Sequence, residues 1–152
     1  MVQKRLQIQG VKGNFTPCLN MHLTLAFIGE YGDPGFISDA LSEVTFEPVR
    51  LVLDGFFLSG DTFLVGIKED KGLMTNAARI RKALSDNGIP FDRKKFTPHF
   101  TVARNIVSEK GLPSDTPFPA AMDADSIFLM RSDRGKNGMI YTVVDEYEIS
   151  RQ

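Results

Sequence analysis

The 152-residue chain contains one cysteine, no tryptophan and two histidines, and its formal net charge is −1. The single Cys18 excludes an internal disulfide framework, lacks the paired spacing of a zinc site and has no base beside it, so we interpret it as a passive thiol. The near-neutral charge argues against a general nucleic-acid coat, because such proteins are usually basic. No apolar run reaches membrane-spanning length, and residues 1–10 lack the apolar core of a signal peptide. These absences predict a cytoplasmic protein.

The length and composition fit one globular domain over residues 1–152, with 42% hydrophobic and 24% charged residues. Apolar residues at helical spacing predict one helix over residues 33–44, which starts at Asp33 and Pro34, and a second over residues 71–87, which stops at Gly88. Residue alternation predicts strands over 22–28, 49–57, 62–68, 99–106, 125–131 and 139–149.

Two turn-forming stretches separate some of these elements. Residues 111–120 form a proline-rich loop in this interpretation, and residues 132–138 form a hairpin turn. No linker is long enough to divide the chain into two domains. The mixed order of strands and helices therefore favours an α+β fold with antiparallel pairing over a parallel doubly wound fold.

Two stretches of the chain repeat a short pattern. FTPCLNMHLTLA starts at Phe15 and FTPHFTVA starts at Phe96, and each begins Phe-Thr-Pro and contains His, any residue, Thr, an apolar residue and Ala. The first stretch has a four-residue insertion before its histidine. Because these are the only two histidines of the chain, a threonine two positions after each one indicates a functional pair.

Strand geometry gives a reason for the two-residue spacing. Side chains at i and i+2 lie on the same side of a strand, about 6–7 Å apart. His22 and Thr24 are therefore predicted to share one face, with apolar residues such as Phe27 on the opposite, core face. His99 and Thr101 are predicted to share a face in the same way. Two such strands related by a pseudo-two-fold axis would enclose two imidazoles and two hydroxyls, which suits a phosphate diester.

The chemistry of these groups favours acid and base catalysis. Displacement at phosphorus needs a base to activate the nucleophile and an acid to protonate the leaving oxygen, and histidine can act as either near neutral pH. Threonine hydroxyls can donate hydrogen bonds to the non-bridging oxygens. A metal site is the alternative, and it is less favoured because a catalytic zinc usually takes three protein ligands. The sequence thus predicts neither a metal nor a cofactor.

The paired HLTL (22–25) and HFTV (99–102) resemble the two H-x-T-x motifs of the two-histidine phosphoesterases, and more narrowly those of the RNA 2′,3′-cyclic phosphodiesterases, also called 2′-5′ RNA ligases. The similarity extends over NMHLTLAFIGE, the helix after it, FTPHFTVAR and the closing SIFLMRSDRGKNGMIYTVVDEYEI. This resemblance implies a bilobal, pseudo-two-fold α+β fold with two antiparallel sheets, outer helices and a central cleft.

The resemblance also implies roles for five side chains. His22 would donate a proton to the ribose 3′-oxygen, His99 would accept one from water, and Thr24 and Thr101 would hold the phosphate. Arg104 matches an arginine that often follows the second motif. An unbroken strand would place Arg104 on the face opposite His99, so either a bulge or the strand end turns it toward the cleft, or it is a solvated surface arginine.

Residues 93–95 form a basic cluster, Arg-Lys-Lys, close to the second motif. This cluster could attract an RNA backbone, but a charge run is more often a solvated turn, and we do not predict a catalytic role for it.

The function that the resemblance implies is metal-independent hydrolysis of RNA 2′,3′-cyclic phosphodiester ends to 2′-phosphomonoesters, with 2′-5′ ligation as the reverse reaction. The alternatives are a non-catalytic nucleotide-binding module on the same fold and a phosphodiesterase for another small cyclic phosphodiester. RNA ends or cyclic nucleotides would be the substrate, with no membrane and no obligate protein partner.

Members of the family usually have a strand and a full helix before the stretch that matches GVKGNFT, where this chain has nine residues. That difference predicts a fragment, a product of a misplaced start, or a variant whose open sheet edge allows self-association.

Overall fold

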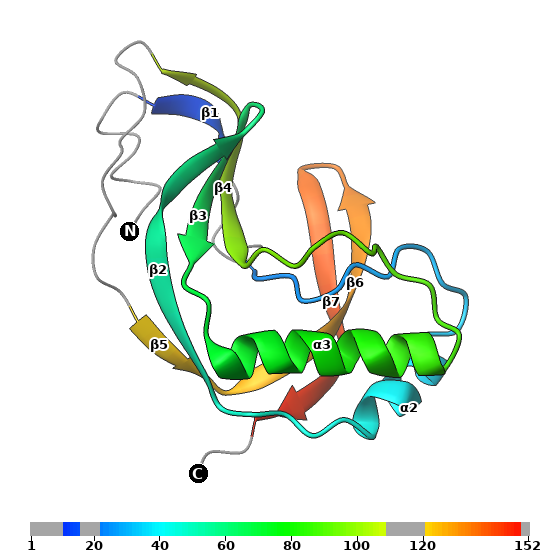
Figure 1. Ribbon diagram of the computed structural model, residues 1–152. Helices are drawn as coiled ribbons and strands as arrows, with labels where there is room; N and C mark the ends of the chain where they lie inside the picture. Colours follow the sequence, from blue (N-terminus) through cyan, green and yellow to red (C-terminus); the bar gives the residue numbers. More distant parts are fainter. Residues whose placement is uncertain (1–10, 16–21, 109–120, 150–152) are drawn as a thin grey trace. The chain divides into compact units, whose positions relative to one another are not determined.

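The computed structural model describes residues 11–15, 22–108 and 121–149. This part of the chain forms two antiparallel sheets and two helices, which confirms the predicted α+β class (Figure 1). The elements are β1 (Val11–Phe15), α2 (Pro34–Ser42), β2 (Val49–Ser59), β3 (Thr62–Ile67), α3 (Lys71–Asp86), β4 (His99–Ser108), β5 (Ala121–Ala124), β6 (Ser126–Gly135) and β7 (Gly138–Glu148). Cys18 and the predicted loop over 111–120 lie outside the described residues.

The larger sheet has five strands in the order β1-β4-β3-β2-β5 (Figure 1). The central strand β3 pairs antiparallel with β2 on one side and with β4 on the other. Five successive residues of β3, from Phe63 to Ile67, are buried. Both faces of β3 are therefore covered, as expected for a central strand that forms the core of its sheet.

A bulge in β2 decides which way its two phenylalanines point. One extra residue lies between Leu53 and Phe56 relative to the partner strand β3. Gly55 lies in this stretch with a φ of +72°, a conformation that glycine adopts without strain. Beyond the bulge, the ring of Phe56 packs 4.8 Å from that of the buried Phe63, while its neighbour Phe57 points to the opposite face.

Both helices begin at aspartate caps. Pro34 is the first residue of α2, and the carboxylate of Asp33 accepts a hydrogen bond of 3.0 Å from a backbone N–H in the first turn, which confirms the predicted start. Asp70 caps α3 in the same way at 3.1 Å. Gly88 follows the end of α3 with a φ of +69°, which confirms the predicted stop. Neither helix of the described chain is long and apolar enough to cross a membrane.

Strands β6 and β7 form a two-stranded antiparallel hairpin. Gly135 pairs with Gly138, so Lys136 and Asn137 make a two-residue loop. A hairpin turn within 132–138 is thus confirmed, but it is shorter than predicted because residues 132–135 continue β6. The ladder continues from this loop to the pair formed by Ser126 and Glu148. The strands therefore begin and end within a few residues of the predicted bounds.

The end of β7 contacts α2 through a small polar cluster. The hydroxyl of Tyr147 donates a 3.2 Å hydrogen bond to the backbone oxygen of Ser38, and the Ser38 hydroxyl donates to the carboxylate of Asp145. The bond from Ser38 lowers the pKa of Asp145, with the backbone N–H of Glu146 as a second cause. Burial raises the pKa of Tyr147.

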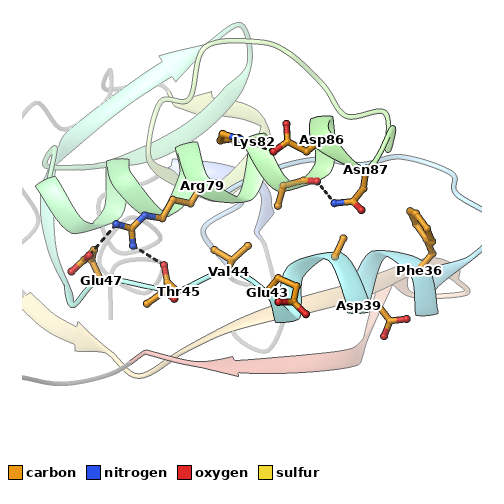
Figure 2. Close-up of a pocket in the computed structure, with 12 residues that line it drawn as sticks. Phe36, Asp39, Glu43, Val44, Thr45, Glu47, Arg79, Lys82, Asp86 and Asn87 are labelled. Atoms are coloured by element: carbon orange, nitrogen blue, oxygen red, sulfur yellow. Dashed lines mark hydrogen bonds and ion pairs between the residues drawn. The ribbon is translucent and has the colours of Figure 1, made fainter.

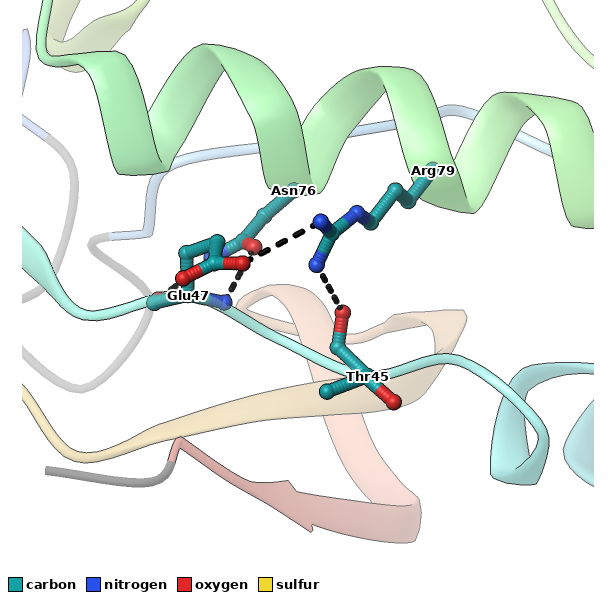
Figure 3. Close-up of polar contacts among 4 residues, drawn as sticks. All are labelled: Thr45, Glu47, Asn76 and Arg79. Carbon is teal, nitrogen blue, oxygen red and sulfur yellow. Dashed lines mark hydrogen bonds and ion pairs between the residues drawn. The ribbon is translucent and has the colours of Figure 1, made fainter.

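A second polar network fixes the segment between α2 and β2 against α3 (Figure 3). Asn76 is completely buried, and its amide accepts from the Glu47 N–H at 2.8 Å and donates to the Glu47 carbonyl at 2.9 Å. Arg79 donates to the Thr45 carbonyl at 2.7 Å and forms a 3.1 Å ion pair with the Glu47 carboxylate. This network supplies both backbone groups of Glu47 with partners where no strand pairs with them.

The described residues fall into two compact units. The first comprises the described parts of 1–23, 52–68 and 98–121, and the second comprises those of 24–51, 69–97 and 122–152. The single two-lobed domain over 1–152 with a central cleft stays a prediction.

Candidate functional site

The second histidine motif opens strand β4. In the pairing with β3, His99 lies opposite Gly66 and Thr101 lies opposite Leu64. Both motif side chains are half-buried, and they share a face because they are two residues apart in a strand. The predicted strand and the predicted same-face placement are therefore confirmed for this motif.

An extra residue in β4 decides the face of Arg104. Neighbouring residues of β3 pair with Thr101 and with Ala103, so Val102 is inserted between them as a bulge. Val102 and Ala103 are only 1% and 0% exposed, as expected when both point to the core side. Alternation after Ala103 then returns Arg104 to the face of His99, where it is exposed. Of the two options for Arg104, the register supports the bulge.

An aromatic ring from β2 contacts the imidazole of His99. The centroids of the Phe57 and His99 rings lie 6.5 Å apart, and their planes meet edge-on at 76°. Phe57 pairs with Leu64, which pairs with Thr101 in turn, so these residues form one row on the face of the motif. Sequence reasoning missed Phe57 because alternation predicts strands but not which residues of two strands lie opposite each other.

The first histidine motif is not in a strand. Residues 22–30 carry neither helix nor strand, so the strand predicted over 22–28 is wrong. The backbone carbonyl of Phe27 accepts a 2.7 Å hydrogen bond from the N–H of Asp92, and that of Leu25 accepts a 3.4 Å bond from the Arg81 side chain. These carbonyls therefore have partners on α3 and the segment after it instead of on a neighbouring strand.

Exposure still alternates along the start of this segment. His22 and Thr24 are exposed, whereas the two leucines that follow them are half-buried. The expectation that Phe27 enters a core is wrong, because its side chain is 62% exposed. Alternation indicates which residues share a side, but it does not ensure that another element covers the apolar side.

The structure brings three of the five predicted site residues onto one surface. His99, Thr101 and Arg104 lie on one face of β4. His22 belongs to the same compact unit as these residues, and Thr24 belongs to the other unit. The meeting of the two motifs at one phosphate stays a prediction.

The basic cluster of residues 93–95 forms an exposed turn that is bonded to its surroundings. The guanidinium of Arg93 lies 4.6 Å from the centroid of the Phe91 ring, within range for a cation–π contact. The Lys94 N–H donates to the carboxylate of Asp92 at 3.0 Å, and its carbonyl accepts from Arg81 at 2.8 Å. These contacts fit the interpretation of the cluster as a solvated turn.

A surface hollow of about 700 Å³ lies between α2, α3 and the segment that connects α2 to β2 (Figure 2). Arg79 pairs with Glu47 at 3.1 Å along its lining, and Lys82 pairs with Asp86 at 2.6 Å. None of the five predicted site residues lines it. Because these four charged side chains are already paired with each other, we interpret the hollow as a gap between packed elements of the fold and not as a binding site.

The face of β4 carries side chains that can bind the negatively charged oxygens of a phosphate group. Imidazole can move a proton near neutral pH, a hydroxyl can donate to a phosphate oxygen, and a guanidinium can bind phosphate through two parallel N–H bonds. Among the described residues, no three His, Cys, Asp or Glu side chains are grouped to hold a metal ion.

Comparison with known proteins identifies relatives along most of the chain. A sequence profile of the 2′-5′ RNA ligase superfamily matches residues 13–136. The RNA 2′,3′-cyclic phosphodiesterase of Archaeoglobus fulgidus is 35% identical over 92 residues, which cover 56% of this chain and only 52%, about half, of that protein. The protein of the same name from Aeropyrum pernix is 29% identical over 143 residues, covering 84% of this chain and 81% of the relative. A crystal structure of E. coli LigT complexed with 3′-AMP has a similar fold, with a TM-score of 0.82, 20% identity and coverage of 99% of this chain and 92% of LigT.

Proposed function

Because the chain belongs to the 2′-5′ RNA ligase superfamily, we propose that it hydrolyses 2′,3′-cyclic phosphodiester ends of RNA to 2′-phosphomonoesters without a metal ion. The observation that best supports this proposal is the register of β4, in which Arg104 lies on the same face as His99 and Thr101 because of the bulge at Val102. The names of the relatives from Archaeoglobus and Aeropyrum support the same substrate class.

In the proposed reaction, His99 takes a proton from water while the water oxygen attacks phosphorus. The bond between phosphorus and the ribose 3′-oxygen breaks, and His22 gives its proton to that oxygen. The products are a 3′-hydroxyl and a 2′-phosphomonoester. Thr24 and Thr101 donate hydrogen bonds to the non-bridging oxygens, and Arg104 pairs with the negative charge that these oxygens carry in the bound substrate.

Ligation uses the same groups with a different nucleophile. A 5′-hydroxyl in place of water would attack phosphorus, and the bond between phosphorus and the 3′-oxygen would break to leave a 3′-hydroxyl and a 2′-5′ phosphodiester bond. Water is present in large excess, so hydrolysis outcompetes this reaction. RNA ends or cyclic nucleotides in the cytoplasm are the substrate in this proposal.

The test uses an oligoribonucleotide that ends in a 2′,3′-cyclic phosphate, incubated with the protein in the presence of a chelator. We expect phosphorus NMR to show conversion to the 2′-phosphomonoester, and we expect His99→Ala to abolish most of it. A 3′-phosphate product would contradict the proposed leaving group. Binding of the oligonucleotide without turnover would favour the nucleotide-binding module.

A further inference from the structure

The geometry points to Phe57 as a positioning residue for His99. Its ring holds the imidazole in the orientation in which a ring nitrogen can take a proton from the attacking water. This inference rests on the proposed function, and it adds a residue that lies outside both histidine motifs.

Three strands place the two rings together. Phe57 comes from β2 and His99 from β4, with β3 between them. The register puts Phe57 beside Leu64 and Leu64 beside Thr101, so the phenyl ring lies on the same sheet face as the motif. The two ring centroids lie 6.5 Å apart at 76°, the edge-on arrangement that aromatic pairs prefer.

The residue opposite His99 keeps this contact open. Gly66 pairs with His99, and a Cβ added to Gly66 would lie 3.5 Å from Cε1 of Phe57 and 2.7 Å from the backbone oxygen of Asp54. The second distance is too short for a real Cβ. The phenyl ring therefore lies beside the position that a side chain at Gly66 would fill, and from there it reaches the imidazole across β3.

Fixing the imidazole matters for the proposed chemistry. The second side-chain torsion of histidine is broad and roughly two-fold, so the backbone of β4 alone does not fix the ring. A general base must hold its nitrogen within hydrogen-bond reach of the proton that it removes. A ring packed edge-on against the imidazole restricts that torsion before substrate binds.

Phe57 is 38% exposed, so a second role would be to stack on a nucleobase. The two roles differ in their kinetic effect. Loss of positioning lowers kcat, whereas loss of a base contact raises KM.

The kinetic test compares Phe57→Leu with Phe56→Leu on the cyclic-phosphate oligonucleotide. Phe56 is the adjacent phenylalanine, but its ring packs on the buried Phe63, on the sheet face opposite His99. We expect Phe57→Leu to lower kcat about tenfold with KM within about twofold, since small displacements of a catalytic group cost one to two orders of magnitude. We expect Phe57→Tyr to recover most of kcat and Phe56→Leu to leave kcat unchanged in the folded protein. Equal losses of kcat in the two leucine variants, or a rise in KM alone for Phe57→Leu, would overturn the assignment.

An NMR measurement tests the contact without relying on turnover. The chain has only two histidines, so the His99 imidazole signals are identified by their loss in His99→Gln. We expect Phe57→Leu to shift these signals and to lower the NMR order parameter of the His99 imidazole. We expect Phe56→Leu to leave the signals in place. Unchanged His99 signals in Phe57→Leu would overturn the inference. Absence of turnover by the wild-type protein would overturn the proposed function, while the NMR signals still decide whether Phe57 orients His99.

Discussion

Arg104 and His99 share one face of β4 although Arg104 is the fifth residue after His99, an odd offset that would put the two on opposite faces of a regular strand. The extra residue at Val102 reverses the alternation between them. An arginine that a regular strand would direct to the opposite side is thereby placed on the face that carries the imidazole and the hydroxyl of the second motif.

Replacing this arginine tests its role toward the phosphate. We expect Arg104→Ala to raise KM for the cyclic-phosphate substrate about 10- to 100-fold, because hydrogen bonds to a charged group contribute about 1.5–3 kcal/mol. Arg50→Ala is the matched control, since Arg50 is an exposed arginine that pairs with Asp123 at 3.3 Å. Steady-state kinetics measure KM for both variants. Equal KM values would contradict a phosphate-binding role and assign Arg104 as a solvated surface residue.

Local signals in the sequence predict the helices well. Asp33 with Pro34 sets the start of α2, and Gly88 marks the stop after α3, because caps and left-handed turns depend on residues close together in the chain. The second motif is predicted well for the same reason, since His99 and Thr101 lie two residues apart in a regular strand.

Long-range pairing is not readable from alternation alone. The segment at 22–28 alternates like a strand, but its carbonyls bond to Arg81 and Asp92. The contact between Phe57 and His99 depends on the register of three strands and on two bulges. A one-residue change of register reverses every face, so these relationships appear only in the folded chain.

The buried amide of Asn76 gives a prediction for stability. We expect Asn76→Ala to lower the free energy of unfolding by about 2–4 kcal/mol, because two backbone groups of Glu47 lose their partners and a cavity forms. Asn87→Ala is the control, since Asn87 is exposed and its amide makes one bond of 2.8 Å to a helix carbonyl. Urea unfolding of both variants measures the difference, and equal losses would contradict the structural importance of Asn76.

Tyr147 gives a prediction for alkaline pH. Burial raises its pKa in the folded chain above the usual value of about 10, so the unfolded chain loses this proton first. The stability that follows from the raised pKa is fully present below about pH 10 and is lost as pH rises through the folded pKa. We therefore expect the stability difference between wild type and Tyr147→Phe to shrink above about pH 10 in thermal unfolding. A constant difference from pH 8 to 11 would contradict this assignment.

Removal of metal ions tests the alternative chemistry for the two histidines. We expect a chelator to leave the rate of cyclic-phosphate hydrolysis within about twofold, because the proposed steps use only imidazole, hydroxyl and guanidinium groups. Loss of activity that a divalent ion restores would instead assign the histidines to a metal site.

The central claim is that the two histidines act as an acid and a base on one phosphodiester. The most direct measurement is turnover by His22→Ala and His99→Ala on two substrates, one with the ribose leaving group and one with a nitrophenolate leaving group. On the ribose substrate we expect each variant to lose roughly 10²–10⁴-fold in turnover. On the nitrophenyl ester the leaving oxygen needs no proton, so His22→Ala should regain most of its activity and His99→Ala should not. Recovery by the His99 variant would reverse the two roles, and equal defects on both substrates would contradict the division into acid and base.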